Sequence, residues 1–218
     1  YNNHDEFDQN NYGILGGMSY LRENDLFRIS ASYNTLDVDN DRFRNVTAAT
    51  GEWTRQLDEL QALSGFVQYA DLDYDGVNDV RDSHLYGVGA GYRRAFIAPG
   101  APLLSLSASY AKEDNRKDFD ELSRDIWSAR AVIGVTPAPK WALNLGVTYQ
   151  YSAYEAEIPL LATTRRDNYY AADFTASYAF TRSFSARLEG LVSKNDSNIE
   201  LFEYRRNVSA LKFRYDFK

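Results

Sequence analysis

The segment DLDYDGVNDVRD, from Asp71 to Asp82, places acidic side chains at its first, third, fifth, ninth and twelfth positions and a glycine at its sixth. A Ca²⁺ ion takes about six to eight oxygen ligands, and carboxylates on alternating residues converge on it only where a glycine lets the chain turn sharply. The spacing therefore predicts a calcium site. Its ligands would be the side chains of Asp71, Asp73, Asp75, Asp79 and Asp82 and the backbone carbonyl of Val77.

The twelfth position is Asp82, where an EF-hand carries a longer glutamate. The segment therefore resembles the aspartate-rich loops of thrombospondin-type and dockerin-like repeats more than an EF-hand. The flanking segments LSGFVQYA and SHLYGVGAGY alternate in the way that strands do. We expect the loop to cap a β-hairpin and calcium to order it without taking part in chemistry. The alternative is a solvated acidic surface loop.

Two further groups of residues could carry acid–base chemistry. Asp82 and His84 lie two residues apart and would share one face of a strand, whereas Ser83 between them would point away and could not serve as their nucleophile. A solvated histidine is the simpler interpretation. Glu155 and Glu157 could mimic a glycosidase pair, but nothing nearby predicts the raised pKa that such a pair needs. We predict that the protein is not an enzyme.

The composition is aromatic and yet hydrophilic on average. The 218 residues include 17 Tyr, 12 Phe and 3 Trp, with a mean hydropathy of -0.51. The sequence contains no cysteine, which excludes disulfides and thiolate metal sites, and its net charge of -7 argues against a nucleic-acid partner. It also lacks the apolar run of about eighteen residues that a membrane-spanning helix requires.

One unit recurs along the chain: about ten residues that alternate between apolar and polar, followed by a break. About eleven such segments are present, and they predict an all-β fold, an antiparallel transmembrane up-and-down β-barrel. The clearest are LYGVGAGYRR, LLSLSASYAK, WALNLGVTYQY and NYYAADFTASYAF, and the others cover residues 11–21, 26–36, 43–57, 60–70, 126–136, 184–194 and 207–217. Only 43–57 has no clear assignment of faces, and it is long enough to hide a turn.

The two faces of these segments differ in a way that suits a membrane barrel. One face carries aromatic residues near the segment ends, where membrane interfaces place aromatic girdles. The other is rich in Gly, Ser, Ala and Asn, with scattered charges that would project into a lumen. Basic rings in a lumen favour anionic solutes; alternatively, the charges pair across strands and rigidify a narrow or plugged lumen. The predicted lumen-facing charges are Arg28, Arg93, Arg130, Asp173, Arg187, Glu189, Lys212 and Arg214.

The breaks between segments alternate between short and long. Short periplasmic turns and long extracellular loops are typical of barrels in the bacterial outer membrane, so we expect residues 1–10 to end an extracellular loop and residues 11–218 to form the barrel. Eleven antiparallel strands cannot close by themselves, because single-chain bacterial barrels have even strand numbers. The count predicts the C-terminal part of a barrel of roughly 12–16 strands, unless residues 43–57 hide a turn.

The terminal hairpin carries the motif SNIELFEYRRN and ends in FRYDFK. The ending resembles the C-terminal signal strand of outer-membrane barrels, although Lys218 follows the last aromatic residue. The hairpin is similar to that of porin-like barrels in tetratricopeptide-containing exporters, including polysaccharide-export porins and surface-lipoprotein assembly modifiers. This resemblance implies a translocation channel, recognition by the barrel-assembly machinery, possible helper subunits and a periplasmic helical-repeat domain upstream.

These features predict an outer-membrane porin-like conduit or export channel with long acidic extracellular loops. We expect contacts with outer-membrane lipid and lipopolysaccharide, no nucleic-acid partner and no cofactor other than calcium. The alternative function is a non-transporting barrel that acts in adhesion or surface recognition. A soluble β-sandwich is the alternative fold.

Overall fold

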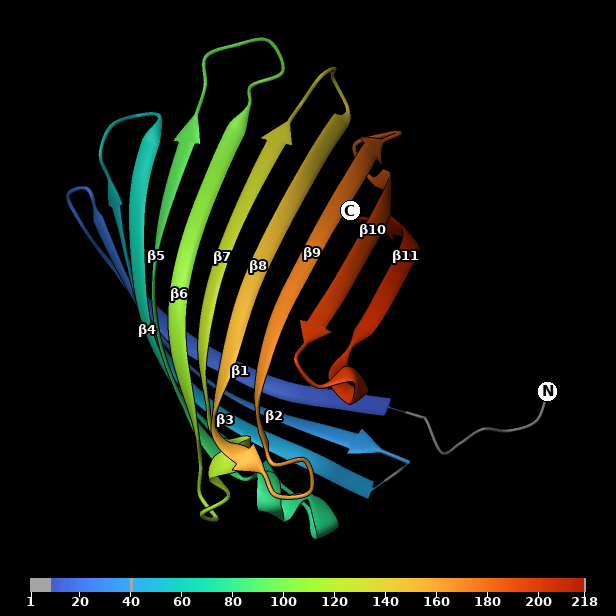
Figure 1. Cartoon of the computed structure of the whole chain (residues 1–218). Helices are drawn as coiled ribbons and strands as arrows, with labels where there is room; N and C mark the ends of the chain where they lie inside the picture. The colour runs from blue at the N-terminus through green and yellow to red at the C-terminus, as the bar shows by residue number, and fades with distance from the viewer. Residues whose placement is uncertain (1–8, 40, 218) are drawn as a thin grey trace.

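The computed structural model describes residues 9–39 and 41–217, which form one antiparallel sheet of eleven strands in sequence order. Figure 1 shows a curved, twisted sheet in which each strand returns beside the one before it. The strands are β1 (Gln9–Arg22), β2 (Asp25–Val38), β3 (Asp41–Gln56), β4 (Gln61–Tyr74), β5 (Ser83–Ala95), β6 (Leu103–Asn115), β7 (Arg124–Val135), β8 (Trp141–Ile158), β9 (Thr163–Ala179), β10 (Phe184–Ser197) and β11 (Tyr204–Tyr215).

Three short 3₁₀ helices lie in connections at the same end of the sheet, which we call the loop end. They are η2 (Gly76–Arg81), η3 (Asp120–Leu122) and η4 (Glu200–Phe202). The opposite end, which we call the turn end, holds the connections after the odd-numbered strands. No helix among the described residues is long and apolar enough to cross a membrane.

All of the predicted strand segments are confirmed, because a period of two in hydrophobicity is a local property of the sequence. All of the ambiguous segment 43–57 except its last residue lies within the single strand β3, which pairs with β2 and β4. The hidden turn considered for this segment is therefore wrong.

Two of the connections expected to be long are instead largely strand. The hairpin of β2 and β3 extends until Val38 pairs with Asp41, and the β8–β9 hairpin continues beyond a bulge until Ile158 pairs with Thr163. Their charged composition argued for loops. In the β2–β3 hairpin the facing residues Asp37 and Arg42 carry opposite charges, which favours a β-ladder. Cross-strand pairing therefore overrides the low strand propensity of these residues.

The register assigns every strand residue to one of two faces. We call one the aromatic face, and on it ring pairs form two rows: Trp141 packs on Tyr178 with ring centroids 4.8 Å apart, and Tyr149 packs on Tyr170 at 5.2 Å. Trp141 and Tyr149 lie eight residues apart on β8. At about 3.3 Å per residue and a tilt of about 40°, the rows are roughly 20 Å apart along a barrel axis, close to the apolar band of roughly 25 Å in membrane barrels.

The fold has almost no hydrophobic core. Among the described residues, the only buried apolar side chains are those of Ala48, Ala62 and Ala70, which lie on the opposite, polar face. On the aromatic face, by contrast, Val67 and Leu145 are 59% and 54% exposed. A soluble sandwich would bury such residues between two sheets. The exposed apolar surface instead matches a barrel whose outer face meets lipid.

The sheet has the class of an up-and-down barrel, but it is open between its first and last strands. β1 and β11 run in the same direction, so they cannot complete an antiparallel barrel by pairing with each other. That the chain forms part of a barrel of roughly 12–16 strands stays a prediction. Of the expected terminal loop, residues 1–8 lie outside the described residues, as does Lys218, whereas Gln9 and Asn10 begin β1.

Phe174 of β9 covers Gly190 of β10, its register partner on the aromatic face. A methyl group at Gly190 would overlap the Phe174 ring, so we expect Gly190→Ala to lower the free energy of unfolding by about 1 kcal/mol, the upper range for cross-strand pairs. Gly16→Ala on β1 is the matched control, because an added methyl group there contacts nothing within 4 Å. Urea unfolding in micelles, followed by tryptophan fluorescence, measures both. Equal losses of unfolding free energy in the two variants would show that the packing of the Phe174 ring over Gly190 does not contribute to stability.

Candidate functional site on the polar face

The register brings the predicted lumen-facing charges onto the polar face, opposite the aromatic face. This placement follows from the alternation of side chains along each strand and from the pairing of each strand with its neighbours. The residues are Arg28, Arg93, Arg130, Asp173, Arg187, Glu189, Lys212 and Arg214.

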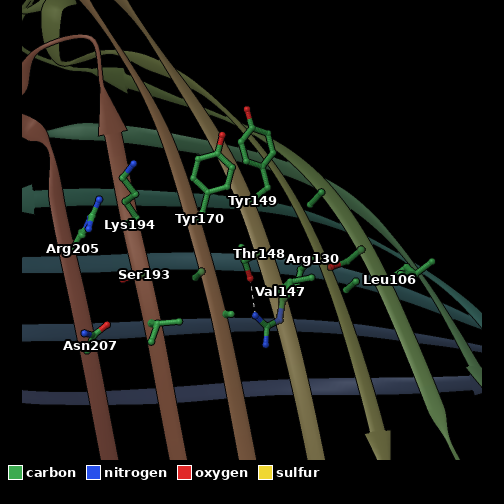
Figure 2. A pocket seen from close by; sticks show the side chains of 16 residues that line it. Leu106, Arg130, Val147, Thr148, Tyr149, Tyr170, Ser193, Lys194, Arg205 and Asn207 are labelled. Carbon is green, nitrogen blue, oxygen red and sulfur yellow. Dashed lines mark hydrogen bonds between the residues drawn. The ribbon is translucent and has the colours of Figure 1, made fainter.

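At the centre of this face, Arg130 of β7 reaches across β8 to Asp173 of β9. Its Nη1 lies 2.7 Å from Oδ1 of Asp173, and its Nη2 lies 3.0 Å from Oδ2. Nη1 also donates to Oγ1 of Thr148 at 2.7 Å, the contact drawn in Figure 2. Gly146 lies beneath this pair: an added Cβ would come within 2.6 Å of Nη2 of Arg130. The bidentate ion pair therefore occupies space that a larger residue on the crossed strand would fill, and one of the two side chains would have to shift.

Most of the other charges on this face are also paired. Glu189 accepts from Arg187 and from Lys212 of the adjacent strand, both at 2.8 Å. Arg28 pairs with Glu52 of β3 at 3.0 Å, and Arg214 pairs with Asp216 at 2.8 Å. Glu52 was missed because the alternation of 43–57 is irregular, although its place on a strand beside Arg28 is the signal that could have identified it.

Among the eight predicted lumen-facing charges, Arg93 alone has no ion-pair partner within the described residues. Together with Arg130 it lines a cavity of about 380 Å³ on the polar face between β4 and β7. Asp173 offsets the charge of Arg130, so Arg93 leaves the cavity positive. The hydroxyl groups around it belong to Thr54, Ser64, Ser105 and Ser107. They were visible in the sequence only as small residues on the polar face. This set can hold a small solute with a hydrogen-bond-accepting or anionic group.

The predicted calcium segment does join two strands, β4 and β5, at the loop end, and Gly76 has the positive φ of 61° that its turn requires. Its aspartates, however, face basic side chains. Arg116, from the connection between β6 and β7, lies 2.8 Å from Asp73, 3.3 Å from Asp71 and 3.3 Å from the buried Asp82. Lys117 lies 3.5 Å from Asp79, and Arg42 binds Asp75.

No group of three or more Asp, Glu, His or Cys side chains in the part of the chain that the structure describes is arranged to hold a metal. Val77, the predicted carbonyl ligand, has a 92% exposed side chain. Arg116 instead brings its guanidinium to three of the predicted ligands. Calcium binding stays a prediction, and it would require Arg116 to move. The sequence signal that could have revealed this competing cation is the basic pair Arg116–Lys117, which lies inside an otherwise acidic connection.

The structure does not pair Asp82 with His84, the combination considered from the sequence. Asp82 follows η2 and accepts the backbone N–H of Tyr74 at 2.8 Å. His84 lies on the aromatic face, where its Nδ1 is 2.9 Å from the hydroxyl of Tyr69 and 3.3 Å from Asp71. Of the two glutamates, Glu155 binds Lys112 at 2.9 Å. The absence of enzymatic activity stays a prediction.

Comparison with known families adds a name to this geometry. Residues 102–218 match the family described as "Putative MetA-pathway of phenol degradation". The chain belongs to this family. The part of the chain that matches the family begins just before β6 and includes the Arg130–Asp173 pair. Arg93 and the calcium-like segment lie before the matched part. The family and the all-β antiparallel sheet fit an outer-membrane β-barrel. No curated protein matches the chain, and the resemblance to tetratricopeptide-containing exporters is not confirmed.

The Arg42–Asp75 pair predicts a measurable titration. A hydrogen bond from Arg42 lowers the pKa of the Asp75 carboxyl below its ordinary value of 3.8. Because the folded-state pKa is lowered, the pair contributes fully above the ordinary pKa and is lost as the pH falls through the lowered one. We expect carboxyl NMR titration to give a depressed pKa for Asp75 and Arg42→Gln to raise it toward 3.8. An unchanged pKa in this variant would contradict the assignment.

Proposed function

We propose that this protein is a porin-like conduit of the outer membrane that passes small monocyclic aromatic solutes bearing a hydroxyl or carboxylate group. The observation that carries the proposal is the cavity between Arg93 and Arg130 on the polar face of a sheet whose other face is apolar and exposed. The family description, with its reference to phenol degradation, supports the choice of solute class.

The two faces of the sheet support the conduit. An apolar face bounded by two rows of aromatic rings suits the bilayer, and a face of small polar residues leaves space for water and solute. The loop end, with its 3₁₀ helices and acidic residues, would be extracellular, and the turn end periplasmic. The localisation in the bacterial outer membrane is part of this proposal.

The cavity would select solutes through Arg93, the one of its two arginines that has no ion-pair partner. Paired charges such as Arg130–Asp173 present little net charge to a passing solute, whereas Arg93 attracts an anionic group. Serine hydroxyls can donate to or accept from a phenolic hydroxyl. Ala62 and Val132 provide apolar contacts for a ring in the same cavity. A neutral phenol and an aromatic carboxylate would both fit this environment.

Arg93→Ser tests this selectivity in the full chain reconstituted into vesicles. We expect the uptake of benzoate to fall several-fold relative to glucose, because the unpaired cation is lost. Arg94→Ser is the matched control: Arg94 is the next residue, lies on the aromatic face and stacks on Phe96. Equal effects of the two substitutions, or no solute uptake in the unaltered protein, would contradict the proposal.

Asp173→Asn should have the opposite effect. It removes the carboxylate that offsets Arg130 while keeping the size of the side chain, so the cavity becomes more positive. We expect the ratio of chloride to potassium permeability in planar bilayers to rise several-fold. A ratio equal to that of the unaltered protein would show that the Arg130–Asp173 pair does not face the permeation path.

Two narrower roles follow from the sequence. An export channel similar to the tetratricopeptide-containing exporters would need a periplasmic helical-repeat domain or helper subunits, and the terminal strand would be recognised by the barrel-assembly machinery. A non-transporting barrel acting in adhesion is the alternative, favoured by the ordered ion pairs among the acidic residues of the loop end. If vesicles containing the protein take up no solute, and the protein binds a ligand only when its loops are intact, adhesion would be supported.

The acidic loop would bind calcium weakly, with a dissociation constant on the order of 0.1–1 mM. Because Arg116 competes for Asp71, Asp73 and Asp82, we expect Arg116→Gln to bind Ca²⁺ several-fold more tightly in calorimetric titration. Asp73→Ala should weaken binding. Affinity that neither substitution changes would show that calcium does not use this loop.

A further inference from the structure

Two cations face each other on the aromatic face, beside its apolar centre. Lys194 of β10 is the register partner of Arg205 of β11. Like charges directly opposite each other destabilise a β-ladder. Asp196 pairs with Lys194, but Arg205 is exposed and has no side-chain hydrogen bond or ion pair among the described residues. Net positive charge therefore remains at this place on the face that would meet lipid.

The cations extend a row of aromatic hydroxyls. Tyr170 is the register partner of Lys194 on one side and of Tyr149 on the other. Figure 2 shows the two tyrosines side by side, with Lys194 and Arg205 on the next strands. This row lies nearer the loop end than the row of Trp141 and Tyr178. It is the level at which tyrosine rings meet the headgroup region in the proposed orientation.

An apolar depression of about 910 Å³ adjoins this row. Alanines on the aromatic face form a low floor between taller side chains, and Lys194 and Arg205 lie at one end. Most of its lining residues carry their side chains on the aromatic face, and we take the depression to open there. Their neighbours Ser107, Arg130, Thr148, Ala171 and Ser193 on the polar face also line it. Its apolar lining includes Leu106, Ala129, Ala131, Val147, Ala172 and Val192.

We propose that this depression binds a phosphorylated lipid of the outer membrane, an inference that rests on the membrane location proposed above. The guanidinium of Arg205 and the ammonium of Lys194 would hold the phosphate, and the Tyr170 hydroxyl would donate to it. One acyl chain would lie across the alanine floor. Charge complementarity selects this occupant: an anion relieves the repulsion between the two cations, and an acyl chain covers the apolar surface beside them.

Native mass spectrometry of the full chain, released from micelles after mixing with phosphatidylglycerol or phosphatidylcholine, tests the inference. We expect the protein to retain phosphatidylglycerol several-fold more than phosphatidylcholine and the double variant Lys194→Gln/Arg205→Gln to lose this preference. Arg206→Gln is the matched control, because Arg206 is the next residue on β11 and pairs with Ser193 on the polar face. Inorganic phosphate in the same buffers should not abolish the preference, since the acyl chain contributes.

Three results would overturn the inference: equal retention of both lipids by the unaltered protein, unchanged preference in the double variant, or lipid-independent dimers that cover β11. Loss of the preference in Arg206→Gln would show a general effect of charge and would overturn it as well. Benzoate uptake and heat-modifiable migration, measured on the same proteins, separate the two proposals. A protein that inserts and conducts without lipid preference fails only here, whereas one that does not insert fails the proposed function.

Discussion

Backbone pairing between neighbouring strands is the interaction on which the rest of this structure depends. The described part of the chain buries only three apolar side chains, all of them alanines, so no hydrophobic core holds the strands together. Each strand instead satisfies its N–H and C=O groups through the strands beside it. The large apolar residues point outward, and the sheet is a stable arrangement only where an apolar solvent such as lipid covers them.

This inversion of the usual soluble fold explains the chemistry of the polar face. Small residues there leave room for long charged side chains to cross a strand, as Arg130 does above Gly146 to reach Asp173. Most of the charges are used in such pairs, which limits the field that a solute would meet. In the proposed conduit, selectivity would depend on Arg93 and on the hydroxyl groups that share its cavity.

Charged side chains are arranged differently at the loop end and on the aromatic face. At the loop end, Arg116 and Lys117 neutralise the aspartates that resemble a calcium loop, so the same spacing that could bind a metal is used to join two neighbouring connections. On the aromatic face the opposite holds, because Lys194 and Arg205 repel each other. The first arrangement is internally compensated, and the second lacks a counter-charge that an anionic lipid can supply.

The sequence by itself determined the strands, their number and, outside 43–57, the face on which most side chains lie, because alternation between apolar and polar residues is a local property. It therefore placed Arg130, Asp173 and Glu189 on one face. It could not determine which residues meet across strands, since register depends on pairing between distant segments. Only the tertiary structure showed that Arg116 forms ion pairs with the aspartates of the calcium-like segment and that Lys194 lies opposite Arg205. It also extended β8 and β9 through residues whose composition had predicted a loop.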